Sequence, residues 1–163
     1  MSIAKIVLTN NLTPEQYYGR INSTEGLKMN ITKQVVILSA TRPQDSIENT
    51  NFRTNTLRGI LGDIRLPFNE ATGVYKGQQE TSFVVVINDE QDLENLKSFA
   101  FKSFDQESIL LQDSNQEAYL IYSNNRIERL GRLEQVSKEV AQDLDSYTIM
   151  NNNYYAVPNP SLR

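Results

Sequence analysis

The sequence predicts an α+β fold in which two helices pack on one face of an antiparallel sheet. Two segments carry apolar residues at helical spacing, and short runs rich in β-branched and aromatic residues lie before, between and after them. Along the chain the order is strand, helix, strand, strand, helix, strand. This order is typical of a ferredoxin-like βαββαβ sandwich. We expect it over residues 34–135 of a single domain spanning 1–163, with extensions at 1–33 and 136–163.

The first half of the predicted core is a buried strand followed by a helix. Residues 35–40 form a short, continuous apolar run, as strands buried on both faces do. Over residues 47–64, apolar side chains such as Leu57 and Leu61 recur at helical spacing. Pro67 then ends the helix, because proline disfavours helical backbone at the residue before it.

The second half begins with a hairpin and continues with a helix. A turn at 76–79 separates two β-prone runs, and Asp89 offers an N-cap to a helix that buries Leu93 and Leu96. The strands of this half are predicted over 71–75, 80–87, 108–111 and 118–122.

Both extensions carry weaker signals. In the N-terminal one, residues 3–8 could form a strand, and Thr13 followed by Pro14 has the form of a helix start. In the C-terminal one, we expect a short helix over 136–144 and a last strand or arm over 147–157.

Composition excludes several kinds of chemistry. The 163 residues contain neither cysteine nor histidine, which removes thiolate catalysis, the Ser-His-Asp triad and the common zinc ligands. We therefore expect no metal or other cofactor. The net charge of −4 opposes nonspecific binding to nucleic acid. No apolar run approaches the ~20 residues of a membrane span, and residues 1–5 do not resemble a secretory signal. We expect a cytoplasmic protein without nucleic-acid or membrane partners.

Tyr75 and Glu80 are the first candidates for a functional site. A four-residue loop between them would make them direct cross-strand partners, with Cβ atoms roughly 4.5–5.5 Å apart on one face of the sheet. A phenol ring beside a carboxylate suits a cationic ligand. The alternative is that both residues decorate an exposed hairpin.

Further candidates flank the first helix and the fourth strand. Ser39 and Arg42 lie where the first strand leads into the helix, and an arginine there could hold a ligand carboxylate in a bidentate way. Asn49 could point from the helix into a cleft, and Gln106 and Glu107 precede the fourth strand. Each of these residues could equally face water or support the local backbone.

Taken together, these segments resemble the phage-encoded S-adenosylmethionine lyases, formerly called S-adenosylmethionine hydrolases. The resemblance covers residues from about 35 to about 135. The matching residues, in order, are Leu38-Ser39-Ala40-x-Arg42, Glu48-Asn49, Arg53, Leu57-Arg58, Gly73-x-Tyr75-Lys76, Glu80, Asp105-Gln106-Glu107-Ser108-Ile109-Leu110 and Tyr119-Leu120-Ile121-Tyr122.

The resemblance implies a fold, an activity and an assembly. It implies a PII-like homotrimer with ligand sites between subunits, and a plausible role against host defence that depends on S-adenosylmethionine. The implied reaction releases methylthioadenosine with homoserine lactone, or with homoserine if water attacks. Tyr75 and Glu80 would then be catalytic, and Ser39, Arg42, Asn49, Gln106 and Glu107 would bind the substrate. Two alternatives remain open: a PII-like protein that binds or sequesters a nucleotide without turnover, and a purely structural interaction protein.

Overall fold

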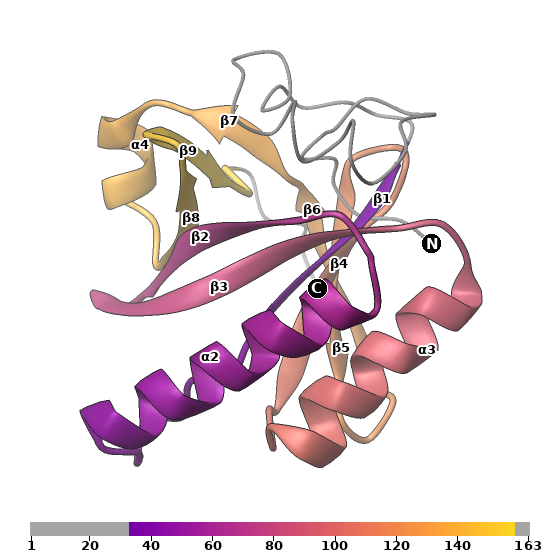
Figure 1. The fold of residues 1–163 in the computed structure, drawn as a ribbon. Coiled ribbons are helices and arrows are strands. Elements are labelled where there is room, and N and C mark those ends of the chain that lie inside the picture. Colours follow the sequence, from indigo (N-terminus) through magenta and orange to yellow (C-terminus); the bar gives the residue numbers. More distant parts are fainter. Residues whose placement is uncertain (1–32, 159–163) are drawn as a thin grey trace.

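The computed structural model describes residues 33–158, in which one curved antiparallel sheet carries helices α2 and α3 on the same side (Figure 1). The strands are β1 (Gln34–Ser39), β2 (Phe68–Tyr75), β3 (Gln78–Ile87), β4 (Ser108–Gln112), β5 (Glu117–Tyr122), β6 (Ile127–Arg132), β7 (Glu134–Val136), β8 (Ser146–Met150) and β9 (Asn153–Ala156). The helices are α2 (Ile47–Asp63), α3 (Glu90–Ser98), a π-helical turn η2 (Phe99–Ser103) and α4 (Lys138–Gln142). The strand predicted over 3–8 and the helix predicted from Thr13 lie outside the described residues.

The predicted ferredoxin-like βαββαβ sandwich, and with it the PII-like fold, is wrong. In the described part of the chain the sheet has nine strands, in the order β6-β5-β4-β1-β3-β2-β8-β9-β7. Its two ends, β6 and β7, are separated in sequence by Leu133 alone. Because neighbouring Cα atoms are about 3.8 Å apart, the two ends of the sheet must approach each other. The sheet therefore curls into a nearly closed barrel, and the strands that close it come from residues after Asn125.

Local capping explains where the helices begin. The Ser46 side chain accepts a hydrogen bond from the backbone N–H of Asn49 at 3.1 Å, and α2 starts at the next residue, Ile47. The Asp89 carboxylate accepts from the N–H of Asp92 at 2.9 Å, so the predicted N-cap of the second helix is confirmed. The short helix predicted over 136–144 is also confirmed, as α4.

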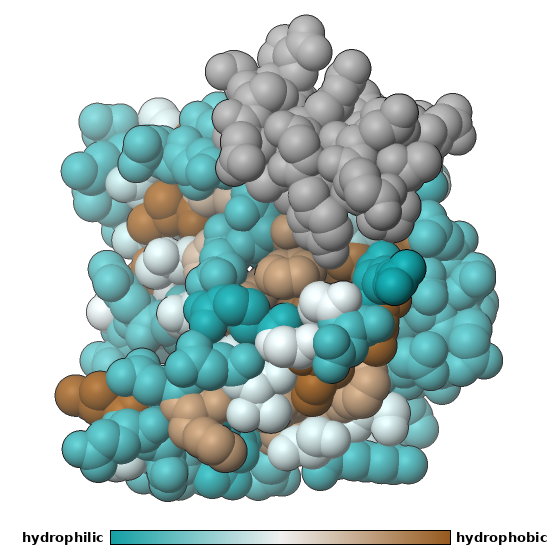
Figure 2. Space-filling view, viewed as in Figure 1, coloured by the Kyte–Doolittle hydropathy of each residue, from teal (hydrophilic) through white to brown (hydrophobic). Residues whose placement is uncertain are grey.

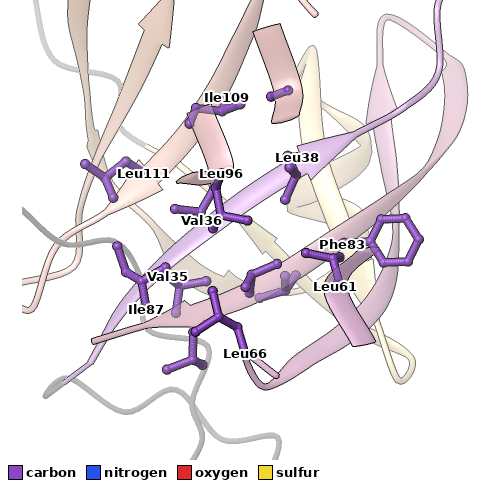
Figure 3. Close-up of a cluster of buried hydrophobic side chains, with 14 of the residues drawn as sticks. Val35, Val36, Leu38, Leu61, Leu66, Phe83, Ile87, Leu96, Ile109 and Leu111 are labelled. Carbon is purple, nitrogen blue, oxygen red and sulfur yellow. The ribbon is translucent and has the colours of Figure 1, made fainter. Parts of the chain in front are cut away.

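The main core lies between the two long helices and the sheet. Leu61 of α2 and Leu96 of α3 are fully buried against strand residues that include Val36 and Leu38 (Figure 3). Strand β3 pairs with β1 on one side and with β2 on the other, so its residues 82–87 are buried within its own sheet. This burial does not require a neighbouring subunit.

The face of the molecule that Figure 2 shows is mostly polar. The view in Figure 2 is largely hydrophilic, with hydrophobic side chains scattered over it. Among the described residues, the most exposed large apolar side chains are Ile47 and Phe52, both on α2. No helix within residues 33–158 has the length and apolar character needed to cross a membrane.

Candidate active site

A pocket of about 160 Å³ lies on the face of the sheet that the two long helices do not cover, and it is partly open to solvent. Its wall combines serine and threonine hydroxyls, two tyrosines and one carboxylate. The lining residues are Ile37, Leu38, Ser39, Gly73, Val74, Tyr75, Glu80, Ser82, Gln106, Ser108, Ile109, Leu110, Leu120, Ser146, Tyr147 and Thr148.

The strand register explains why these side chains meet. Directly opposed residues of antiparallel strands point to the same face of a sheet. Ser39 of β1 is opposite Ser82 of β3, and Gly73 of β2 lies between Glu80 of β3 and Thr148 of β8. Six strands, β1, β2, β3, β4, β5 and β8, thereby contribute residues to the pocket lining.

Tyr75 and Glu80 both line the pocket, but they are not the direct partners that the sequence predicted. The hairpin turn contains two residues, Lys76 and Gly77, whose φ angles are 48° and 81°. Positive φ at both positions is the geometry of a type I′ turn. Tyr75 is consequently opposite Gln78, and Glu80 is opposite Gly73. The two predicted residues are diagonal neighbours on the same face, a relation that usually places their Cα atoms about 7–8 Å apart.

Gly73 forms the floor beneath the Glu80 carboxylate. A methyl group placed on Gly73 would lie 2.8 Å from Ser82 Oγ and 3.8 Å from Glu80 Oε1. The missing side chain therefore makes room for both groups. Glu80 as a whole residue is exposed, yet burial raises the pKa of its carboxyl group because that group lies against the strand floor. A nearby cation or hydrogen-bond donor would favour its ionised form.

Ser39 and Gln106 are fixed parts of the pocket wall. Ser39 is 5% exposed, and its hydroxyl donates to the carbonyl of Thr81 at 2.9 Å and accepts from the N–H of Thr41 at 3.0 Å. The side-chain amide of Gln106 donates to the carbonyls of Thr41 and Phe104, both at 3.1 Å. These bonds hold the end of β1 against the segment that enters β4.

The other three predicted residues do not line the pocket. Arg42 donates to both carboxylate oxygens of Asp45, at 3.0 and 2.8 Å, and to Asp105 at 3.3 Å. Asn49 and Glu107 are exposed. The structure thus brings Ser39, Tyr75, Glu80 and Gln106 together and leaves Arg42, Asn49 and Glu107 outside.

Sequence reasoning missed the contribution of β8 to the wall. Ser146, Tyr147 and Thr148 belong to the segment that was predicted as a C-terminal extension, and β8 pairs with β2 directly beside Gly73. The sequence from Ser146 to Met150 is β-prone, which indicated a strand. It could not indicate which strand would be its partner.

Comparison with known proteins assigns the family. A model of the S-adenosylmethionine lyase family matches residues 36–158, which is more than half of the chain. The chain belongs to the S-adenosylmethionine lyase family. The resemblance inferred from the short motifs is thereby confirmed. Every residue that lines the pocket lies within the matched range. A search of curated proteins finds no significant match.

Membership defines the enzyme class and the substrate. The activity is that of an S-adenosylmethionine lyase, and S-adenosylmethionine is the small-molecule substrate. Among residues 33–158, no group of three histidine, cysteine, aspartate or glutamate side chains is placed to hold a metal ion.

Proposed function

We propose that the enzyme cleaves S-adenosylmethionine by letting the substrate attack itself. A carboxylate oxygen of the methionine moiety bonds to the γ-carbon, the bond from that carbon to sulfur breaks, and its electron pair goes to sulfur. The products are homoserine lactone and neutral methylthioadenosine, and no proton is transferred. The observation that carries this proposal is a pocket rich in hydroxyls in a chain that has no cysteine or histidine to act as nucleophile or base.

In such a reaction the main task of the protein is to position the reacting groups of the substrate. Holding reacting groups at near-attack distance can lower the activation barrier by roughly 7–11 kcal/mol. The cationic sulfur and the anionic carboxylate neutralise each other in the transition state, so exclusion of water also favours the reaction. Rigid walls are suited to this task, and Ser39 and Gln106 are both fixed by backbone hydrogen bonds.

The proposed roles follow from where the side chains lie. Tyr75 lines the pocket and is 60% exposed, and its ring could cover the adenosine or the sulfonium group. Glu80, whose carboxylate lies above Gly73, would hold the amino group or the ribose of the substrate. Ser39 would shape the wall near the methionine end. Arg42, Asn49 and Glu107 lie outside this pocket, so their predicted binding roles would require a substrate that extends beyond it.

Water is the rival nucleophile. Glu80 would then act as general base, and the product would be homoserine. The test is turnover in ¹⁸O-labelled water with mass spectrometry of the earliest products. Internal attack gives unlabelled lactone first, with label entering only the carboxylate when the lactone later opens. Early label in the carbon-bound hydroxyl of homoserine would overturn internal attack.

We also propose that the active assembly is a homotrimer with sites between subunits. The pocket, at about 160 Å³, is smaller than the roughly 300–1,000 Å³ of typical ligand sites. It is partly open to solvent, and Tyr75, one of its lining residues, is exposed. A neighbouring subunit would complete it. Light scattering at assay concentration should give three subunits. A fully active monomer would contradict the proposal.

The proposed biological role is depletion of a methyl donor. In a phage-infected cell, destruction of S-adenosylmethionine in the host cytoplasm would deprive S-adenosylmethionine-dependent defence systems, such as restriction enzymes that require it, of their cofactor. The role would be refuted if a phage carrying the inactive Glu80→Gln gene escaped restriction as well as one carrying the intact gene.

A further inference from the structure

Arg53 belongs to α2 and does not itself line the pocket, yet it contacts the backbone beside two residues that do. Its guanidinium group donates at 2.9 Å to the carbonyl of Ala40, the residue that follows Ser39 of the pocket wall. A second nitrogen of the same group donates to the carbonyl of Phe104, two residues before Gln106. One side chain therefore connects the end of β1 with the segment that enters β4.

The segment that Arg53 contacts has an unusual backbone. The π-helical turn η2 is capped by Phe104, whose N–H donates to the carbonyl of Phe99 at 3.0 Å. Asp105 follows with a φ angle of 52°, in the left-handed region that residues other than glycine adopt at a cost. Such conformations persist where surrounding contacts fix them. The position of Gln106, the next residue, therefore depends on the contacts that fix this backbone.

The side chain of Gln106 bonds to one of the carbonyls that Arg53 uses. Its amide nitrogen donates to the carbonyl of Phe104 and to that of Thr41, both at 3.1 Å. Because both N–H groups of the amide are engaged, the polar group that Gln106 can offer to a ligand is its amide oxygen. The Phe104 carbonyl thus accepts from Arg53 and from Gln106, which couples the two side chains through one backbone group.

Asp45 fixes the guanidinium group of Arg53 from the other side. The Asp45 carboxylate lies 3.3 Å from Arg53 Nε, and the exposed fractions of the two side chains are 4% for Asp45 and 17% for Arg53. The guanidinium carbon also lies 5.6 Å from the centre of the Phe104 ring. A planar group with five N–H donors suits two carbonyls and a carboxylate together, whereas a lysine ammonium is a single point of charge on a flexible chain.

We propose that Arg53 is a positioning residue of the lyase. It fixes Ser39 and Gln106 in the pocket wall through the backbone beside each of them. The inference rests on the proposed function in one respect, namely that the substrate occupies this pocket. When a substrate attacks itself, a shift of the wall that shapes its bent conformation reduces the fraction of productive conformers.

Arg53→Lys is the first test, and Arg58→Lys is its matched control. Arg58 also lies on α2, forms an ion pair with Glu70 at 2.7 Å and lies 5.7 Å from the centre of the Phe83 ring. None of these three residues lines the pocket. Both substitutions keep the positive charge, and thermal melting should show both proteins folded at the assay temperature. Arg53→Lys should lower kcat for methylthioadenosine release by about 30-fold and change KM by less than about threefold, while Arg58→Lys leaves both unchanged.

A double-mutant cycle tests whether Arg53 acts through Gln106. In a Gln106→Ala background, the lysine substitution at Arg53 should lower kcat by about fivefold or less, because the side chain that it positions is already gone. The loss that remains would reflect Ser39. A purely structural contribution of Arg53 would instead lower kcat by the same factor in both backgrounds.

Asp45→Asn tests the same role in a chain that keeps Arg53, and it decides the matter if Arg53→Lys does not fold. It removes the carboxylate that pairs with Arg53, so the guanidinium group should bind the two carbonyls less firmly. At neutral pH kcat should fall by about fivefold or more, again with KM changed by less than about threefold.

An unchanged kcat in folded Arg53→Lys protein, or in Asp45→Asn protein where the lysine variant is unfolded, would overturn the inference. An equal loss in Arg58→Lys, or an undiminished effect of the lysine substitution in the Gln106→Ala background, would overturn it as well. Failure of the proposed function is a separate result. Full activity in folded Gly73→Ala protein would show that the substrate lies elsewhere, whereas the Arg53 variants would still report whether this side chain affects turnover.

Discussion

A single methyl group on the pocket floor should damage activity much more than stability. Gly73→Ala places a Cβ 2.8 Å from Ser82 Oγ, about 0.6 Å short of an ordinary van der Waals contact. Overpacking of this kind costs typically about 1–3 kcal/mol. Because Gly73 does not have a positive φ, alanine fits the native backbone and lowers the conformational entropy of the unfolded chain. This second effect stabilises the folded state by about 0.4–1 kcal/mol. We therefore expect the free energy of unfolding to fall by roughly 0–2.6 kcal/mol, which lowers Tm by up to about 10 °C.

The effect on catalysis should be larger because the methyl group lies beside Glu80. It would be 3.8 Å from Glu80 Oε1, where a bound substrate has to fit. Misplacement of reacting groups by about 1 Å can cost roughly 10²-fold. We expect kcat/KM to fall about 100-fold, measured from methylthioadenosine release, while thermal melting shows a folded protein.

Gly59→Ala is the matched control. Gly59 is exposed on α2, and an added methyl group meets no atom within 4 Å. Alanine should stabilise the helix by about 0.5–1 kcal/mol and leave kcat/KM unchanged. Full activity in a folded Gly73→Ala protein would show that the substrate does not occupy this pocket.

Three further predictions follow from the charged groups. Glu80→Gln should abolish turnover, while Tm measured by scanning fluorimetry stays the same or rises slightly because a partly buried carboxylate has been removed; loss of folding would contradict this. Burial raises the pKa of Glu80, so kcat/KM should fall on the acid side through an apparent pKa above the ordinary 4.5, and an acid limb at or below that value would be evidence against it. The hydrogen bond and charge of Arg42 lower the pKa of Asp45 in the folded protein. The Asp45 carboxylate therefore stabilises the fold fully at pH values above its ordinary pKa of 3.8, and this stabilisation is lost as the pH falls through the lower pKa of the folded state. The Tm of the wild type should therefore exceed that of Asp45→Asn at neutral pH, and the difference in Tm should narrow in acid. A difference in Tm that does not depend on pH would refute the stabilising role of the Asp45 carboxylate.

The local elements were predictable because their signals are local. The apolar spacing of α2 and the N-cap of α3 act within a few residues, and the structure contains both. The hairpin register was harder. Type I′ turns usually carry asparagine or aspartate before glycine, whereas this turn places Lys76 in the left-handed region. The Lys-Gly pair therefore gave no clear sign of a two-residue loop.

The closure of the sheet depends on contacts that are distant in sequence. Strand β8 pairs with β2, and β7 reaches β9, through short segments with little pattern of their own. Packing and loop geometry determine which strands these segments pair with, and a short apolar pattern does not indicate either of them. This is why the sequence indicated four residues of the pocket, Ser39, Tyr75, Glu80 and Gln106, but not its β8 wall.

Arg42 illustrates a further limit of sequence reasoning. An arginine at the end of a strand suits a ligand carboxylate, but it also suits a buried aspartate. In the structure Asp45, three residues later, takes that place. Residue type and position alone could not separate the two partners.

The most direct measurement of the central claim is a time course of methylthioadenosine formation from S-adenosylmethionine at a large molar excess over protein. Wild type and Glu80→Gln would be run side by side, with products followed by mass spectrometry. The account predicts many equivalents of methylthioadenosine per wild-type chain, matched by homoserine lactone or its opened form, and none above background from the variant. An intact substrate after long incubation with stoichiometric wild-type protein, or equal turnover by the variant, would contradict it.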